Sequence, residues 1–122
     1  MVELNDISFH DAVILDVRKE ASKIIFELEA VQYGKEGHTY TGYLCFDNIQ
    51  TIKKDGQLVN CINKCYDINK YYDDGEILEV DIKNNICTIS VIWESYKDNK
   101  RDFSEYEIIS SNIYWQEIGV FE

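Results

Sequence analysis

Hydrophobic and polar residues alternate with a period of two along most of the chain. Within residues 13–17, Val13, Leu15 and Val17 fall on one side of an extended backbone, and Ile14 and Asp16 fall on the other. Successive side chains of a strand point to opposite faces of a sheet, so this spacing is typical of a β-strand. The pattern therefore predicts that strands are the main element of the fold.

The same alternation predicts further strands, separated by short polar turns. They cover residues 23–33, 39–46, 49–59, 76–82, 86–96 and 103–118. Asp55-Gly56 and Asn84-Asn85 are tight-turn signals, because these residue types tolerate the positive φ that such turns require. The chain is thus predicted to reverse direction repeatedly over short distances.

Three segments depart from simple alternation. In residues 60–72, Tyr66, Ile68 and Tyr72 alternate as in a strand, whereas Ile62 and Cys65 fit a weak helical stripe. We favour a strand there and keep one short helix as the alternative. Residues 73–75, Asp-Asp-Gly, have the composition of a turn, and residues 110–112 indicate a bulge or break.

Eight or nine strands joined by short turns make neighbouring strands antiparallel. A flat sheet of that size would leave two open edges and one wet face, and closing or doubling the sheet removes most of that exposure. The chain has no proline-rich or glycine-rich linker and no repeat. We predict a single all-β domain over residues 1–122, an antiparallel meander that forms a β-sandwich or a partly closed barrel, with Trp93 and Trp115 in its core.

The composition of the chain limits the cellular compartment and the classes of molecule that the protein can bind. No apolar run approaches the roughly 18 residues of a membrane span, and the first residues lack the apolar segment of a signal peptide. We therefore expect a cytoplasmic protein, in which Cys45, Cys61, Cys65 and Cys87 are free thiols. The formal net charge is −11, which disfavours nucleic acid and anionic membranes. It fits solubility alone or a basic protein partner; the sequence does not indicate an oligomeric state.

The strongest concentration of acids lies beside a group of tyrosines. The acids are Asp73, Asp74, Glu76, Glu79 and Asp81, and the tyrosines are Tyr66, Tyr71 and Tyr72. Their spacing does not fit an EF-hand calcium loop. One interpretation is a charged strand that resists aggregation. The other is a partner-binding patch, because tyrosine is common at protein interfaces; we take these eight residues as the predicted partner site.

Other polar residues suggest chemistry only weakly. His10 and Asp11 are adjacent, so on a strand their side chains would diverge, and they could pair only at a turn. We interpret them as turn residues, with His10 bonding a nearby carbonyl, or as a ligand contact. Glu27 with Glu29, and Glu105 with Glu107, have the spacing of paired glycosidase carboxylates but equally that of a solvated strand face.

Motifs of catalysis and metal binding are absent from the sequence. It has no G-x-S-x-G, no phosphate-binding glycine loop and no H-E-x-x-H. We predict no catalytic residues, no metal site and no cofactor, and we expect the protein not to be an enzyme.

Three stretches, "FHDAVILDV", "LCFDNIQTI" and "YDINKYYDDGEILEVDI", carry a resemblance. Together they resemble a family of small uncharacterised bacterial domains that open with Phe-His-Asp-Ala/Ser. Such domains also carry F-x-x-[IV]-x-x-[IL] in mid-chain and a late D-G-x-[IL]. The matching residues here are Phe9, His10, Asp11, Ala12 and Phe46. The resemblance implies an all-β fold without catalytic residues and, since some members lie beside toxin genes, an immunity-like role.

Two functions from different classes follow. The first is a non-enzymatic protein-binding module, in its most specific form an immunity-like protein that neutralises a basic toxin domain through acids and tyrosines. The alternative is a small β-barrel that binds an apolar ligand in its interior, or a structural domain without a ligand. A salt-sensitive association with a basic protein would favour the first, and stabilisation by small molecules would favour the second.

Overall fold

The computed structural model describes residues 3–34, 38–59, 74–96 and 99–121. Its elements in chain order are η1 (Leu4–Asp6), β1 (Val13–Glu20), β2 (Lys23–Gln32), β3 (Thr39–Lys54), β4 (Gln57–Leu58), β5 (Asp74–Lys83), β6 (Ile86–Ser95) and β7 (Lys100–Phe121). Every paired strand in these ranges is antiparallel. The predicted all-β antiparallel fold is therefore confirmed. The alternatives for residues 60–72 lie outside the described residues.

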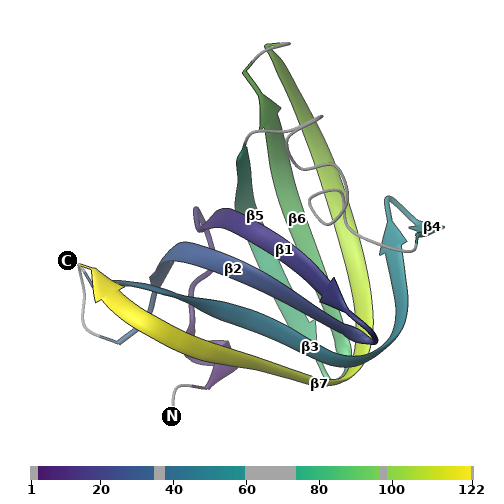
Figure 1. The fold of residues 1–122 in the computed structure, drawn as a ribbon, viewed down its shortest axis with the longest axis horizontal. Helices are drawn as coiled ribbons and strands as arrows, with labels where there is room; N and C mark the ends of the chain where they lie inside the picture. The colour runs from purple at the N-terminus through teal and green to yellow at the C-terminus, as the bar shows by residue number, and fades with distance from the viewer. Residues whose placement is uncertain (1–2, 35–37, 60–73, 97–98, 122) are drawn as a thin grey trace.

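The sheet is a ring made of two three-stranded meanders. Its strand order is β2-β1-β5-β6-β7-β3-β4, and an additional β2–β3 pairing closes the ring. One meander is β1-β2-β3 and the other is β5-β6-β7; β3 joins β7 on one side, and β1 joins β5 on the other (Figure 1). The β1–β5 seam has only two residue pairs, Val13 with Glu76 and Ile14 with Gly75. Of the two predicted architectures, the structure is thus the partly closed barrel, with an irregular outline.

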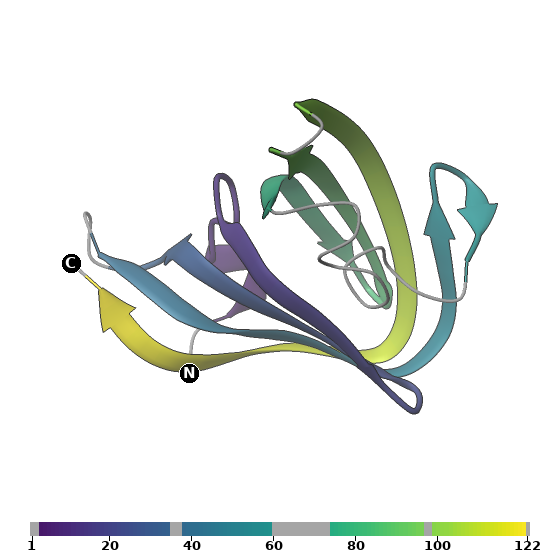
Figure 2. The same cartoon turned by 45° about the horizontal axis from the view of Figure 1, so that its top comes forward.

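Strand β7 connects the two meanders by bending. Its first part pairs with β6 up to Ile109, and its later part pairs with β3 from Tyr106 onward. Figures 1 and 2 show β7 passing from the β5-β6-β7 meander to the β1-β2-β3 meander. Of the bulge or break predicted at residues 110–112, the break is wrong, because β7 continues through them, and a bulge occurs on the strand paired with Ser110. The extra residue lies on β3 instead: Ile49 pairs with Ser110 and Thr51 with Ile109, so Gln50 is a bulge.

Strand β3 covers two segments that the sequence pattern predicts as separate strands. The predicted strands 39–46 and 49–59 form one strand up to Lys54, followed by the Asp55-Gly56 turn and the short β4. Asn48 lies between the two predicted strands with a φ of 52°. Asparagine tolerates this left-handed conformation, so the backbone deviates there without leaving the sheet.

The interior of the ring is packed with large side chains. Those that are fully buried are Trp93, Tyr106, Phe26, Phe46, Ile14, Ile24, Leu28, Leu44, Ile77, Ile89 and Ile108. The prediction for Trp93 is confirmed, and Trp115 is partly buried against the same core. Cys45 and Cys87 are buried free thiols, and burial raises the pKa of Cys87 to about 12. Within the described ranges, no helix has the length and apolar character needed to cross a bilayer.

The prediction of a turn at residues 73–75 is wrong for its last two residues. Asp74 and Gly75 already belong to β5, and Gly75 pairs directly with Trp93. An added Cβ at Gly75 would lie 2.6 Å from Cζ3 of Trp93 and 3.2 Å from Cδ1 of Ile14. The glycine is therefore required for space beneath the indole ring and not for a turn.

A bulge in β5 sets which of its side chains face water. The register with β6 shifts between Ile77 and Glu79, which leaves Leu78 as the extra residue. Simple alternation places Ile77 on the same side as Glu79 and Asp81, and that prediction is wrong. Ile77 is fully buried, whereas Glu79 and Asp81 are exposed, because one extra residue reverses the facing of all that follow.

Candidate functional site

Four carboxylates lie together on the outer side of the β5-β6-β7 meander. They are Glu79 and Asp81 on β5 and Glu105 and Glu107 on β7, and we call this set the acidic face. Glu79 and Glu105 both pair with Ser90 of β6, and Asp81 and Glu107 both pair with Thr88. The inward neighbours of these residues along β6 and β7 are buried. The register of three strands thus brings two acidic pairs, distant in sequence, onto one surface.

The spacing of the acidic face follows from sheet geometry. Neighbouring strands lie roughly 4.8 Å apart, so the carboxylate-bearing backbones of β5 and β7 are about 10 Å apart, and residues two apart on one strand are about 7 Å apart. The small side chains of Ser90 and Thr88 lie between them. Among the described residues, no group of three or more His, Cys, Asp or Glu side chains is arranged to hold a metal ion. The acidic face therefore presents its charges separately.

Two lysines adjoin this face without forming an ion pair with it: Lys53 of β3 pairs across the sheet with Glu107, and Lys83 follows Asp81 on the same side of β5. None of the four carboxylates forms an ion pair within the described parts of the chain; the neighbouring pairs are Arg101 with Glu94 at 3.5 Å and Lys100 with Asp102 at 3.7 Å. Carboxylates held at these distances repel one another, and an approaching cationic surface relieves that repulsion. The acidic face is therefore complementary to a basic macromolecule.

Apolar and aromatic side chains adjoin the acidic face. Phe103, on the same side of β7, is 57% exposed and pairs with Ile92 of β6. Tyr96 is also exposed and donates a hydrogen bond from its hydroxyl to Asp74. Exposed aromatic residues beside charges are typical of protein interfaces. The surface therefore offers an aromatic contact in addition to its charge.

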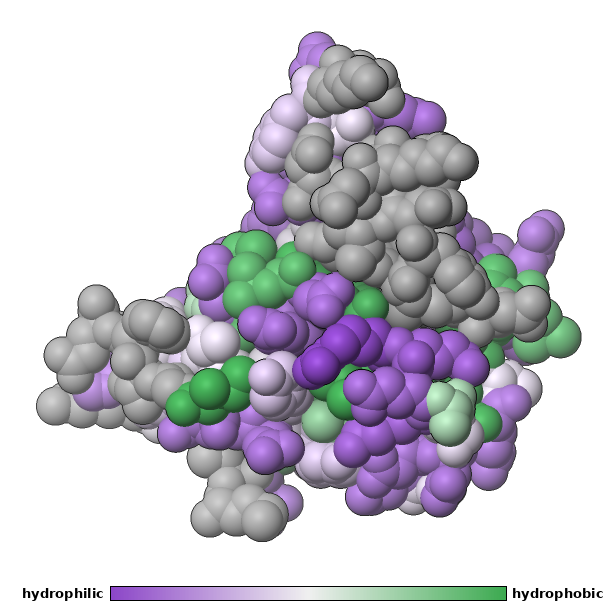
Figure 3. Space-filling view, in the orientation of Figure 1, coloured by the Kyte–Doolittle hydropathy of each residue, from purple (hydrophilic) through white to green (hydrophobic). Residues whose placement is uncertain are grey.

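A different surface covers β1 and β2. Hydrophilic side chains gather over these strands in Figure 3. They carry both signs of charge, with Arg18 lying 3.9 Å from Asp16 and, on the neighbouring strand, Lys23 lying 3.8 Å from Asp47. This surface thus carries paired charges of both signs, although Glu27 and Glu29 of β2, like the residues of the acidic face, form no ion pair among the described residues.

Comparison of the chain with protein-family models, with curated proteins and with solved structures found no match. The function of the site is therefore argued from its own residues.

The residues of the predicted partner site are only partly described. Glu79 and Asp81 belong to the acidic face, and Glu76 and Asp74 lie on the same side of β5. Asp73, Tyr66, Tyr71 and Tyr72 lie outside the described residues. The sequence predicts Glu105 and Glu107 only as a separate pair, either on a solvated strand face or with the spacing of glycosidase carboxylates. Their place opposite β5 depends on strand register, for which the sequence carries no local signal.

His10 and Asp11 occupy the tip of a turn. The amide of Ala12 donates to the carbonyl of Phe9 at 3.0 Å, and Asp11 has a φ of 67°. Nδ1 of His10 bonds the carbonyl of Leu78 at 2.7 Å, and its Nε2 lies 3.5 Å from Asp11. Both side chains are about two-thirds exposed. His10 thus contacts the carbonyl of the bulge residue that turns the acidic face outward.

The position of His10 predicts a pH dependence. The hydrogen bond to Leu78 raises the pKa of His10 above its ordinary 6.5, and the charges of Asp11, Glu76 and Glu79 raise it further. A raised pKa means that the folded state binds the proton more tightly than the unfolded chain. This contribution to stability is present below the unfolded pKa and is lost as pH rises through the folded pKa. An NMR titration of the imidazole should therefore give a midpoint above 6.5.

The sequence contains only two histidines, His10 and His38. A His38→Gln variant leaves the His10 resonance alone in the spectrum and serves as the reference chain. An Asp11→Asn substitution in that background should lower the midpoint, since it removes one of the charges that favour the imidazolium. A midpoint at or below 6.5 in the reference chain would show that the turn does not hold His10 as described.

Proposed function

We propose that the protein is a non-enzymatic, cytoplasmic protein-binding module that uses its acidic face to bind a basic protein. The observation that carries the proposal is the placement of Glu79, Asp81, Glu105 and Glu107 on one outer surface, where none of them forms an ion pair with a described residue. Charge complementarity speeds encounter and selects partners of opposite sign. The net charge of −11 adds long-range attraction of the same sign.

The most specific form of this proposal is an immunity-like protein that neutralises a basic toxin domain. The resemblance of residues 9–12, Phe-His-Asp-Ala, to such domains supports it, and the structure gives these residues structural roles. Phe9 and Ala12 are buried, and His10 and Asp11 form the turn. In this proposal the turn supports β5, and the contact with the toxin is made by the acidic face and by exposed aromatic residues such as Phe103.

The alternative, an apolar ligand held inside a barrel, has less support. Trp93, Tyr106, Phe26 and Phe46 are fully buried and fill the centre of the ring, so space for an apolar ligand is limited to pockets beside the core, such as the one lined by Ile82, Ile113 and Trp115. No residue of the acidic face is needed for that function. Binding of a basic protein is therefore the function that the geometry favours.

The proposal predicts salt-sensitive binding to a basic partner. The purified chain should be tested by isothermal titration calorimetry against the purified products of the genes that flank its own, at low and at high ionic strength. We expect a basic product to bind at low ionic strength and to bind on the order of tenfold or more weakly at high ionic strength, because salt screens exposed charges. A neutral or acidic flanking product serves as the control. Binding that salt leaves unchanged, or none to any basic product, would contradict the proposal.

A further inference from the structure

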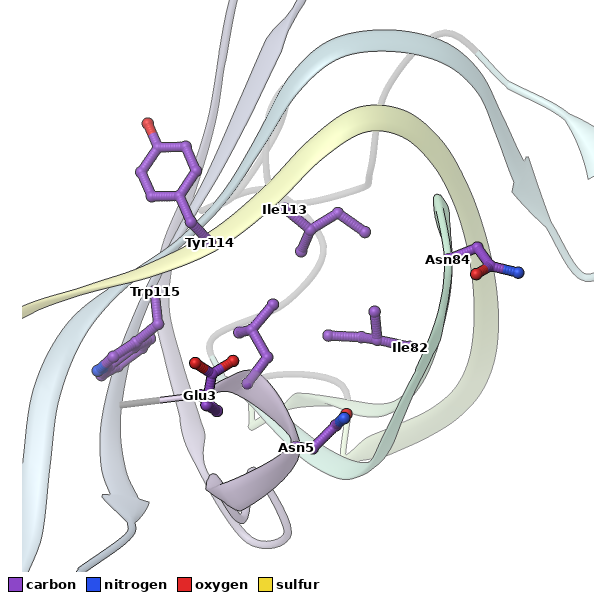
Figure 4. A pocket seen from close by; sticks show the side chains of 8 residues that line it. Glu3, Asn5, Ile82, Asn84, Ile113, Tyr114 and Trp115 are labelled. Carbon is purple, nitrogen blue, oxygen red and sulfur yellow. The ribbon is translucent and has the colours of Figure 1, made fainter. Parts of the chain in front are cut away.

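A pocket opens on the inner side of the ring, away from the acidic face. It has a volume of about 340 Å³ and lies between η1, the end of β5 and the later part of β7 (Figure 4). Ile82 and Ile113 point toward one another across the hollow, whereas Tyr114 and Asn84 point away from it. Both isoleucines are partly buried against the core. The pocket therefore has an apolar floor large enough for a short hydrocarbon chain.

Trp115 forms one wall and is held in place on several sides. Its Nε1 donates to the hydroxyl of Tyr33 at 3.2 Å, and Phe9 meets its ring edge-to-face at 5.8 Å between centroids. Gly42 leaves room for it, because an added Cβ there would lie 2.6 Å from Cζ2 of the indole. The indole N–H is thus already bonded, so the aromatic ring is what Trp115 contributes to the lining of the pocket.

Glu3 gives the pocket its charge. Its carboxylate lies beside Trp115 at the rim (Figure 4). Among the described residues, no basic side chain lines the pocket and none forms an ion pair with Glu3. A carboxylate next to an indole ring attracts an organic cation through charge and through the cation–π interaction. By contrast, the ring of Tyr114 has Lys23 near it, with Nζ 5.6 Å from the centroid.

We propose that this pocket binds an alkylammonium group, with the ammonium between Glu3 and Trp115 and the hydrocarbon chain on Ile82 and Ile113. The ligand is a small organic amine or a lysine side chain, which share this chemistry. The site uses no residue of the acidic face, so this inference does not depend on the function proposed above and fails or holds separately from it.

Three six-carbon probes test the inference. Hexylamine carries the cation, 1-hexanol is neutral and hexanoate is an anion. We expect hexylamine to shift the indole N–H signal of Trp115 in an NMR titration, with Trp93, fully buried elsewhere in the core, as the unshifted reference. Hexylamine should bind at least about tenfold more tightly than hexanol, because a charge-assisted contact is added to the same apolar burial. Equal binding of all three probes, or no shift of Trp115, overturns the inference.

Glu3→Gln should weaken hexylamine binding by about tenfold and leave hexanol binding unchanged, since only the charge of the rim is lost. Asp6→Asn is the matched control: it removes the same charge from the same exposed turn, outside the pocket. An equal loss in both variants overturns the role of Glu3. Nα-acetyl-lysine methylamide, which carries a lysine side chain, distinguishes a lysine side chain from a free organic amine as the ligand. Binding comparable to that of hexylamine supports a lysine side chain, and binding of hexylamine alone supports a free amine.

Discussion

Replacing Trp93 by alanine is expected to lower the free energy of unfolding by about 3–5 kcal/mol, the usual cost of removing a large buried aromatic side chain. Trp93 is fully buried, its ring meets Tyr106 edge-to-face at 6.4 Å, and its Nε1 donates to the Tyr106 hydroxyl at 2.9 Å. The ring also covers Gly75 on the neighbouring strand. Since domains of this size are stable by only about 5–15 kcal/mol, the loss should be obvious in a urea unfolding curve.

Phe103→Ala is the control for Trp93→Ala, because it removes an aromatic side chain ten residues away that is 57% exposed. It should cost less than about 1 kcal/mol. Should Trp93→Ala fail to fold, Trp93→Phe keeps a ring over Gly75 while losing the Nε1 donor, and we expect a smaller loss from it. A Trp93→Ala variant as stable as Phe103→Ala would contradict the described core.

Alternation along the sequence is sufficient to predict that the strands exist. In β6 both faces carry apolar residues, so the pattern does not decide which face is inward, and the structure buries Cys87, Ile89, Val91 and Trp93. Alternation gives the wrong facing in β1 and in β5, because the bulges at Leu15 and Leu78 are backbone irregularities that no residue type indicates. In β1, Ile14 and Val17 are both buried and Leu15 is exposed, so the predicted grouping of Val13, Leu15 and Val17 on one face is wrong. The composition of residues 73–75 was misleading for a different reason. A glycine that serves a turn and a glycine that makes room for an indole look the same in sequence.

The candidate site, too, could be predicted from the sequence only in part. Glu105 and Glu107 were correctly placed on one exposed strand face, and Glu79 and Asp81 on another. Their combination into one acidic face depends on the pairing of β6 with both β5 and β7. Such long-range register is set by the packing of the whole ring and has no local signal. The amine pocket was missed for the same reason, since Glu3 and Trp115 are more than a hundred residues apart.

The largest expected effect on binding comes from reversing charge on the acidic face. In a Glu105→Lys/Glu107→Lys variant, two of the four carboxylates become ammonium groups, so attraction to a basic partner turns partly into repulsion. We expect the dissociation constant to rise on the order of 100-fold, because each unfavourable contact across an interface costs free energy and every 1.4 kcal/mol is about tenfold. Glu105→Lys lies across β6 from Glu79, whereas Glu107→Lys places a second ammonium directly opposite Lys53 of β3, so we expect a small loss of stability, below about 1 kcal/mol.

Glu27→Lys/Glu29→Lys is a matched control for that variant. It introduces the same change in charge at the same two-residue spacing, on β2, which lies on the opposite side of the ring from β6. Long-range electrostatics alone would weaken binding equally in both variants, whereas a contact at the acidic face affects only the first. Urea unfolding of both variants establishes that each is folded before binding is measured.

The central claim is that the outer surface of β5-β6-β7 is where a basic protein binds. The most direct test is to measure, side by side, the dissociation constants of the wild-type chain and of the two double variants with the same basic partner. We predict a loss on the order of 100-fold for Glu105→Lys/Glu107→Lys, and a loss of less than about threefold for Glu27→Lys/Glu29→Lys. Equal losses in the two variants, or a larger loss in the β2 variant, would contradict the claim.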